Sequence, residues 1–325
     1  MKAERKISPA VAVFLWVALS WTPAVLAEPV RVGVPAKSLT FLNYYAGEKF
    51  GLYRAEGLEV SLEEITPKIT ISGMVSGEID YTTAIGSAIR AAVTGIPVKA
   101  TMFSMDRVVL FMFGKPNFKS IEDLKGRKNV VAVTDIAATP AFAAAAMARA
   151  HGVNPDRELT FISMGTVANA LAALQGGSAD VAILSLPFNF KAEELGFRHL
   201  GSAADYMKSP FAGVAATDAK LKSNPAQVKR MIRATLKGLE FTRSPANRER
   251  VVDFIAEEFK LDRKSGDRAL TETIKALSEN GLMPEDAVKA EVEDMRERLK
   301  IKGDVSVTKL VDYTLLRQVL AEMKR

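Results

Sequence analysis

The sequence has 325 residues, of which 48% are hydrophobic and 25% are charged. This is the composition of a globular protein long enough for about two domains, and it does not indicate disorder. The chain has no cysteine, which excludes disulfides, thiolate metal sites, cysteine nucleophiles and a lipid-modified N-terminal cysteine. The formal net charge of +6 is spread without a basic block, which does not favour binding to nucleic acid.

Residues 1–27 have the pattern of a secretory signal peptide, with a basic start, an apolar run over Ala10–Leu19 and a small residue, Ala27, at the end. The alternative is an uncleaved membrane anchor. Pro9 and Pro23 bracket a run shorter than the roughly 18 residues that a membrane span needs. We expect cleavage after Ala27 and export of the mature protein to the periplasm.

The mature chain opens with a βαβ pattern. Val30–Val34 alternates as a strand, Thr40 is a candidate N-cap for a helix over Phe41–Phe50, and Leu58–Leu62 is the next strand. Sequential strand, helix and strand segments favour a parallel sheet with helices on its faces.

Two stretches about a hundred residues apart, Ile71–Ala100 and Ala168–Gly201, share one pattern. Each predicts a helix, a glycine C-cap and a short strand that an aspartate precedes. The aspartates, Asp80 and Asp180, suggest a carboxylate pair for acid/base chemistry. We interpret them instead as turn residues, because the start of a strand lies at the end opposite a ligand cleft. The repeat predicts two lobes of similar build.

The apolar run Val108–Phe113 predicts a buried strand that leaves the first lobe, and Val214–Ala216 predicts the strand that returns to it. Between them lies a second βαβ set, and after them a tail of amphipathic helices expected to pack on the first lobe. The predicted fold class is α/β, with two Rossmann-like lobes joined by two crossing segments. Residues 28–113 and 214–325 are expected to form lobe 1, and residues 114–213 lobe 2.

Several segments, taken together in their order and spacing, resemble the periplasmic solute-binding proteins of ABC importers for nitrate, sulfonates, taurine and thiamine-pyrimidine precursors. The resemblance runs from about Val30 to the C-terminus and implies the type II two-lobed fold, closing over a small molecule. It implies a small-molecule ligand and an ABC permease as partners, and no cofactor. The segments are Ala46–Tyr53, Glu56–Val60, Ser76–Asp80, Ser120–Gly126, Leu171–Leu174, Ser185–Phe188 and Lys191–Phe197.

In open α/β lobes a ligand binds at the carboxyl ends of the strands, where helix N-termini favour a carboxylate, sulfonate or phosphate. We therefore favour an anionic ligand, with Arg107 as a charged clamp. The alternatives are an ion pair between Arg107 and Asp106, caps for the hydroxyl residues and core positions for the phenylalanines. The candidate ligand-binding residues are Ser38, Thr40, Phe41, Ile85, Gly86, Ser87, Ser104, Arg107, Asp135, Thr139, Ser185, Pro187, Phe188 and Phe211.

The leading hypothesis is a monomeric extracytoplasmic receptor, without catalytic or metal-binding residues, that delivers its solute to an ABC permease. One alternative is an enzyme of thiamine-pyrimidine biosynthesis with the same fold, which the resemblance associates with a cysteine-rich stretch that this chain does not have. Another is a ligand sensor for a membrane signalling protein. The chain has no P-loop or G-x-S-x-G motif, and we interpret His151 and His199 as a helix-end and a surface residue.

Overall fold

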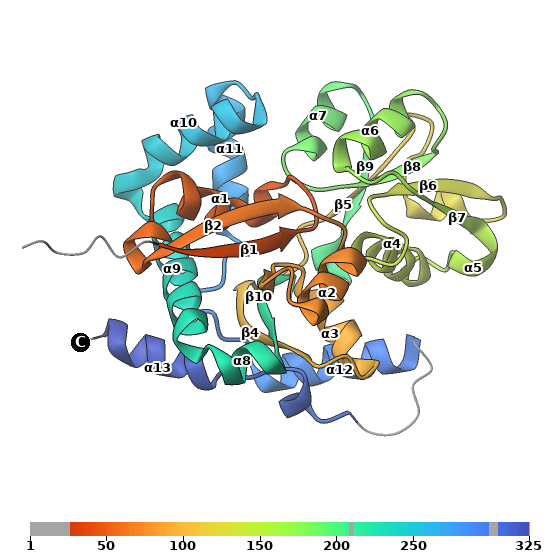
Figure 1. Ribbon diagram of the computed structural model, residues 1–325. Coiled ribbons are helices and arrows are strands. Elements are labelled where there is room, and N and C mark those ends of the chain that lie inside the picture. Colours follow the sequence, from red (N-terminus) through yellow and green to blue (C-terminus); the bar gives the residue numbers. More distant parts are fainter. Residues whose placement is uncertain (1–26, 208–210, 299–304, 325) are drawn as a thin grey trace, which may run out of the picture.

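The computed structural model describes residues 27–207, 211–298 and 305–324. The chain forms two lobes, each built on a five-stranded sheet with helices packed against it (Figure 1). The predicted α/β class with two Rossmann-like lobes is confirmed. The predicted signal peptide lies outside the described residues except for Ala27. Within the described part of the chain, no helix is both long enough and apolar enough to span a bilayer.

The first sheet has the strand order β2-β1-β3-β10-β4. Strands β1, β2 and β3 are parallel, and β10 runs antiparallel to both of its neighbours. The elements are β1 (Glu28–Val34), β2 (Leu58–Glu64), β3 (Tyr81–Thr82), β4 (Val98–Met105) and β10 (Ala212–Thr217), with α1 (Leu42–Lys49), α2 (Pro67–Ser76), α3 (Ile85–Val93) and the short 3-10 helices η1 (Leu39–Phe41) and η2 (Arg54–Glu56).

The second sheet has the strand order β7-β6-β8-β5-β9. Its strands β6, β7 and β8 are parallel, and β5 runs antiparallel to β8 and β9. The elements are β5 (Phe111–Gly114), β6 (Asn129–Val133), β7 (Leu159–Ser163), β8 (Val181–Leu184) and β9 (Arg198–Ser202), with α4 (Thr139–Ala150), α5 (Pro155–Glu158), α6 (Val167–Gln175), α7 (Phe188–Glu194), η3 (Ile121–Leu124) and η4 (Ala203–Asp205).

Strand β5 lies across the expected boundary between the lobes at residue 113. All of its residues pair with β8 or β9, because the continuous apolar run that contains them completes the second sheet and not the first. The chain therefore enters the second sheet at Phe111. The return strand begins at Ala212, two residues before its predicted start. We propose that lobe 2 extends from β5 to η4.

The aspartates of the sequence repeat hold matching positions in the two lobes. A carboxylate oxygen of Asp80 accepts a hydrogen bond from the Arg31 N–H at 2.9 Å, and the other lies 2.5 Å from Lys220 Nζ. Asp180 accepts from the Val130 N–H at 2.9 Å and from Lys115 Nζ at 2.7 Å. Each aspartate precedes the strand that follows the repeat helix, at the end of the sheet away from the interlobe space. Their local contacts are those of structural turn residues.

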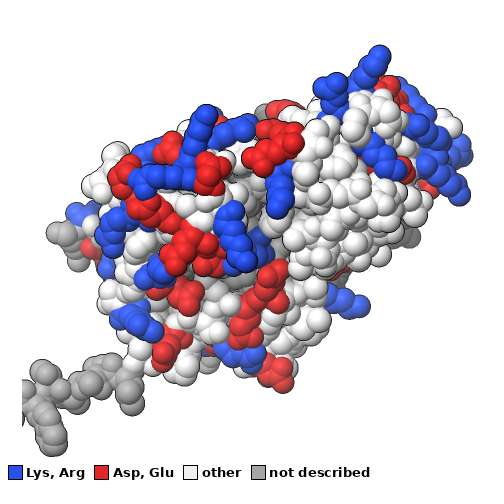
Figure 2. All heavy atoms as spheres, turned by 90° about the horizontal axis from the view of Figure 1, so that it is seen from above, with Lys and Arg blue, Asp and Glu red and all other residues white. Residues whose placement is uncertain are grey.

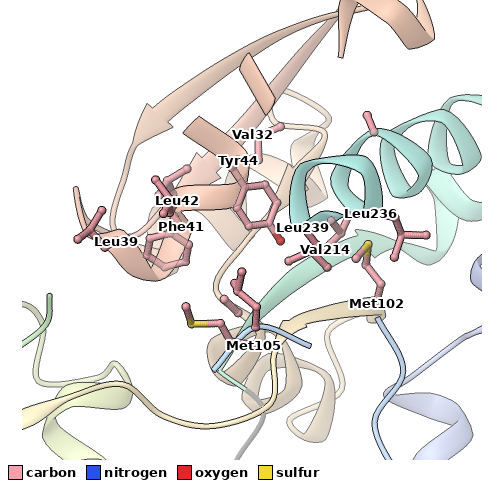
Figure 3. Close-up of a cluster of buried hydrophobic side chains, with 14 of the residues drawn as sticks. Val32, Leu39, Phe41, Leu42, Tyr44, Met102, Met105, Val214, Leu236 and Leu239 are labelled. Atoms are coloured by element: carbon pink, nitrogen blue, oxygen red, sulfur yellow. The ribbon is translucent and has the colours of Figure 1, made fainter. Parts of the chain in front are cut away.

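The C-terminal helices pack against the first lobe. Figure 3 shows Leu236 and Leu239 of α9 gathered with Met102 and Val214 of the sheet in one buried cluster. Full burial of each such side chain contributes roughly 1.5–3 kcal/mol to folding. The tail consists of α8 (Asp218–Ser223), α9 (Pro225–Arg243), η5 (Pro245–Asn247), α10 (Arg248–Phe259), α11 (Arg263–Ile274), α12 (Glu285–Arg298), η6 (Val307–Lys309) and α13 (Thr314–Met323).

Candidate functional site

A cavity lies between the lobes, at the carboxyl ends of the parallel strands of both sheets. The loops after β1, β2 and β3 supply one side, and the loops after β6, β7 and β8 supply the other. The space that the centre of a water molecule can occupy is about 60 Å³. One water needs about 10–15 Å³ by this measure, so the cavity suits a compact molecule. It is lined by Pro35, Ala36, Ser38, Thr40, Phe41, Thr66, Pro67, Ala84, Ser87, Leu110, Thr134, Asp135, Ala138, Thr139, Pro140, Gly165, Val167, Ile183, Ser185 and Phe211.

The N-termini of α2, α3 and α4 contribute to this lining. Their N-cap residues, Thr66, Ala84 and Ala138, make no side-chain capping hydrogen bond. The first-turn N–H groups of a helix have no acceptor inside the helix and carry the positive end of its dipole. The cavity is therefore a place where an acceptor oxygen of a ligand can be bound.

Ser185 gives the most direct sign of a ligand. It lies just after β8, is 3% exposed and lines the cavity, and its Oγ has no hydrogen-bond partner among the residues that the structure describes. A buried hydroxyl left without a partner costs roughly 1–3 kcal/mol, so such groups are normally satisfied. A polar group of a ligand in the cavity would complete its hydrogen bonding.

The ionisable side chain in this lining is Asp135, in the loop between β6 and α4. One of its oxygens, Oδ1, accepts a hydrogen bond from the Ala137 N–H at 2.8 Å. No lysine, arginine or histidine occurs among the described residues that line the cavity. The expected preference for an anion thus has helix N-termini and hydroxyls to support it, but no cationic side chain in the described lining itself. Arg90 lies behind this lining and donates a hydrogen bond to Ser87 Oγ at 2.8 Å.

Arg107 does not line the cavity. Its side chain is 54% exposed, and its Nε donates a hydrogen bond to Asp106 Oδ1 at 3.1 Å. This is the ion-pair alternative that the sequence left open for Arg107. The clamp role has no support in this arrangement, because the guanidinium is engaged away from the cavity.

The structure brings together eight of the other candidates at the cavity and places five elsewhere. Ser104 is buried and accepts a hydrogen bond from the Tyr44 hydroxyl at 3.1 Å. Ile85 belongs to a core cluster of the first lobe, and Phe188 packs against one in the second. Gly86 and Pro187 are absent from the lining. Those at the cavity are Ser38, Thr40, Phe41, Ser87, Asp135, Thr139, Ser185 and Phe211.

Sequence reasoning missed Thr66 and Pro67, which begin α2 at the cavity. The same signature, a threonine followed by proline at a helix start, led to the selection of Thr139. Applying it to every helix start would have found this pair. Leu110 lies in the segment between β4 and β5 and has no comparable sequence signature. Its position in the lining depends on how the two sheets are arranged.

The lobes also contact each other directly. The carbonyl of Leu186 in the second lobe accepts hydrogen bonds from the Leu39 N–H at 3.1 Å and from Ser38 Oγ at 3.2 Å. At another edge of the interface, Arg268 of α11 lies 4.1 Å from the ring centroid of Phe190 and donates to Glu193 at 3.2 Å. The two lobes are therefore in direct contact, with the cavity between them.

The face seen in Figure 2 carries charges of both signs beside a broad area without charged side chains. Helices α10 and α11, at the top of Figure 1, are bridged at their surface by ion pairs of Arg263 with Glu249 and Asp253. A mixed surface of this kind differs from the single-sign stripe typical of nucleic-acid binders.

A family model described as NMT1/THI5 like matches residues 38–247. Among curated proteins, the riboflavin-binding protein RibY of Chloroflexus aurantiacus is 27% identical over 214 residues, which are 63% of this chain and 59% of RibY. The chain thus matches about three fifths of the length of that relative.

Solved structures of similar fold cover most of the chain. One, from Bordetella bronchiseptica RB50, has a TM-score of 0.80 at 19% identity, covering 92% of this chain and 98% of its own. The periplasmic nitrate-binding protein NrtA of Synechocystis PCC 6803 has a TM-score of 0.76 at 14% identity, covering 92% and 89%. The periplasmic aliphatic sulphonate-binding protein SsuA of Escherichia coli has a TM-score of 0.64 at 16% identity, covering 87% and 91%.

The fold is not limited to binding proteins. The desulfurization enzyme DSZB has a TM-score of 0.65 at 12% identity, covering 91% of this chain and 99% of the enzyme. At these identities the structural likeness establishes the fold, and the activity has to be argued from the site.

Proposed function

The chain belongs to the NMT1/THI5-like family, and from this membership and its interlobe cavity we propose that it is an extracytoplasmic solute receptor. It binds a small polar organic molecule between its lobes and delivers it to an ABC permease. The periplasmic nitrate- and sulphonate-binding proteins of the same fold support this role. The observation that carries the proposal is the unpartnered, buried hydroxyl of Ser185 in a cavity built equally by both lobes.

Closure is the event that such a receptor would couple to transport. A ligand that contacts the loops of both lobes stabilises the closed arrangement, because only that arrangement offers it both sets of contacts. Leu186 and Ser38 already join the lobes directly, so closure in this chain does not depend on the ligand alone. A bound ligand adds its own contacts to the Leu186–Ser38 contact between the lobes.

Export completes the proposal. Residues 1–27 act as a signal peptide cleaved after Ala27, and the mature protein works in the periplasm as a monomer. The alternative of a sensor for a membrane signalling protein uses the same cavity and the same closure. The genes next to this one distinguish the two roles, because a transporter is encoded with a permease and an ATPase.

The second candidate function is an enzyme with this fold. The structural likeness to the enzyme DSZB supports it. Activating a hydroxyl such as Ser185 for nucleophilic attack requires a neighbouring base within hydrogen-bond reach. Ser185 Oγ has no such partner, and Asp135 is the ionisable side chain of the described lining. The site therefore supports binding better than catalysis.

Thermal unfolding of residues 28–325 with candidate solutes tests the receptor proposal. Nitrate, sulfonates, carboxylates, pyrimidines and riboflavin form the panel. A solute at 100 times its dissociation constant adds about 2.7 kcal/mol of stability, which raises the melting temperature by several degrees. A hit should also reduce the radius of gyration in solution scattering, since it favours closure. Binding that leaves the lobe arrangement unchanged, or turnover of a bound compound, would contradict the receptor proposal.

A further inference from the structure

The charge of the cavity points to a ligand class that the fold alone does not specify, and this inference rests on the proposed receptor function. Asp135 places a carboxylate in the lining, and the described lining residues include no cationic side chain to neutralise it. Among the described residues, only one oxygen of Asp135 has a hydrogen-bond partner, the Ala137 N–H. The other oxygen has no hydrogen bond from the described residues.

A simple anion in this cavity would lie close to that carboxylate. Like charges within a few ångströms repel, and Asp135 is only partly exposed, so water does not fully screen this repulsion. Part of the wall is apolar, with Phe41, Phe211 and Ile183, so only the hydroxyls of the lining and the helix N-termini offset this cost. Helix N-termini favour an acceptor atom, but their effect is partial and confined to the first turn.

A ligand that carries an N–H group and an acceptor atom suits both the Asp135 carboxylate and the helix N-termini. Its N–H donates to Asp135, in a charge-assisted hydrogen bond of the stronger kind. Its acceptor atoms face the N-termini of α2, α3 and α4, and Ser185 Oγ serves as donor or acceptor as needed. We propose that the solute is a compact amine, amide or amino-substituted heterocycle, neutral, cationic or zwitterionic, and that Asp135 selects it over simple anions.

The test compares Asp135→Asn with the wild-type protein. Asparagine keeps an oxygen for the Ala137 N–H, so the loop is retained while the charge is lost. Asp156→Asn is the matched control, because it removes an exposed carboxylate on α5, at the far end of the second sheet. Each protein is incubated with a deproteinised small-molecule extract of bacterial cells, washed and denatured, and the released compounds are identified by mass spectrometry.

The wild-type and Asp156→Asn proteins should retain a compound that bears an N–H group and is not a net anion. Its affinity, measured with the pure compound, should fall roughly tenfold or more in Asp135→Asn, as expected for a hydrogen bond to a charged group. Ethanesulfonate should bind the wild-type protein more weakly than taurine, from which it differs by an amino group. Retention of a net anion, or equal affinity in Asp135→Asn, would overturn the inference. Retention of nothing by any variant would instead overturn the receptor function.

Discussion

Ser185 and Ser104 are two buried serines in opposite situations. The hydroxyl of Ser104 accepts a hydrogen bond from Tyr44, whereas that of Ser185 faces the cavity without a partner. Without a solute, Ser185→Ala should leave the free energy of unfolding unchanged or raise it, because the desolvated hydroxyl disappears. Ser104→Ala should lower it by roughly 1–3 kcal/mol, because the Tyr44 hydroxyl is then left unpaired.

Urea unfolding of the two variants measures this contrast. For Ser185→Ala, weaker solute binding should accompany undiminished stability, the pattern of a residue kept for function. If Ser185→Ala loses as much stability as Ser104→Ala, the Ser185 hydroxyl has a structural partner and does not mark a ligand site.

Asp180 contributes a pH-dependent part of the stability. Burial alone would raise its pKa, but Lys115 and the Val130 N–H outweigh this and hold the pKa of Asp180 below its ordinary value. A depressed pKa in the folded state means that folding favours the ionised carboxylate. The resulting stabilisation is complete above the unfolded-state pKa of about 3.9 and is lost as the pH falls through the lower folded-state pKa.

The variant Asp180→Asn should therefore unfold more easily than the wild type at neutral pH. The difference in free energy of unfolding should shrink as the pH is lowered from about 5 toward 2, the range in which the wild-type carboxylate gains its proton. Urea unfolding at a series of pH values measures the difference. A difference that stays constant with pH would show that the charge of Asp180 is not the source of the stabilisation.

At the scale of elements, strand β10 depends on a glycine. A Cβ built on Gly213 would lie 2.1 Å from the Met102 carbonyl oxygen and 2.7 Å from the Ile85 side chain. The neighbouring atoms belong partly to the backbone of β4 and cannot move aside cheaply. Gly213→Ala should lower the free energy of unfolding by about 1–3 kcal/mol or more, the cost of overpacking a core.

Gly266 provides the control for this prediction. It lies inside helix α11, and a Cβ there would make contacts of 3.4 Å or longer. Gly266→Ala should be neutral or stabilising by up to about 1 kcal/mol, because alanine is the better helix former. Chemical unfolding of both variants separates the two cases, and equal effects would show that β4 adjusts to the larger residue at position 213.

Elements with local signals were predictable, and those set by distant packing were not. The alternation of Val30–Val34 and the proline at the start of α4 mark these elements in the sequence alone. Strand β5 shows only a short apolar run, which fits either sheet. Its partners in the second sheet come from residues about 70 to 90 positions later, so its assignment required the fold.

The candidate site follows the same division. Thr139 and Ser185 stand at strand or helix ends that the sequence marks, and both line the cavity. The placement of Arg107 depends on the path of the chain between the two sheets. No periodic pattern in the sequence predicts the direction of a side chain in a segment that connects two sheets. In the structure, Arg107 donates a hydrogen bond to its neighbour Asp106.

At the scale of the molecule, the proposed receptor function makes ligand affinity depend on how readily the lobes close. Arg268 belongs to the helical tail of the first lobe, yet it stacks on Phe190 and pairs with Glu193 in the second. Both contacts exist only when the lobes are together. An exposed ion pair contributes about 0–1 kcal/mol and a cation–π contact about 0.5–1 kcal/mol, so their loss shifts the equilibrium toward the open form by about 1 kcal/mol.

Arg268→Ala should therefore weaken solute binding a few-fold without touching the cavity, because less of the free protein is closed and competent to bind. The control is Arg263→Ala on the same helix, whose partners Glu249 and Asp253 lie within the first lobe. Calorimetric titration gives the affinities, and solution scattering without solute should show a larger radius of gyration for Arg268→Ala alone. Equal affinities in the two variants would mean that the lobes close through the cavity and the Leu186 contacts, independently of this outer pair.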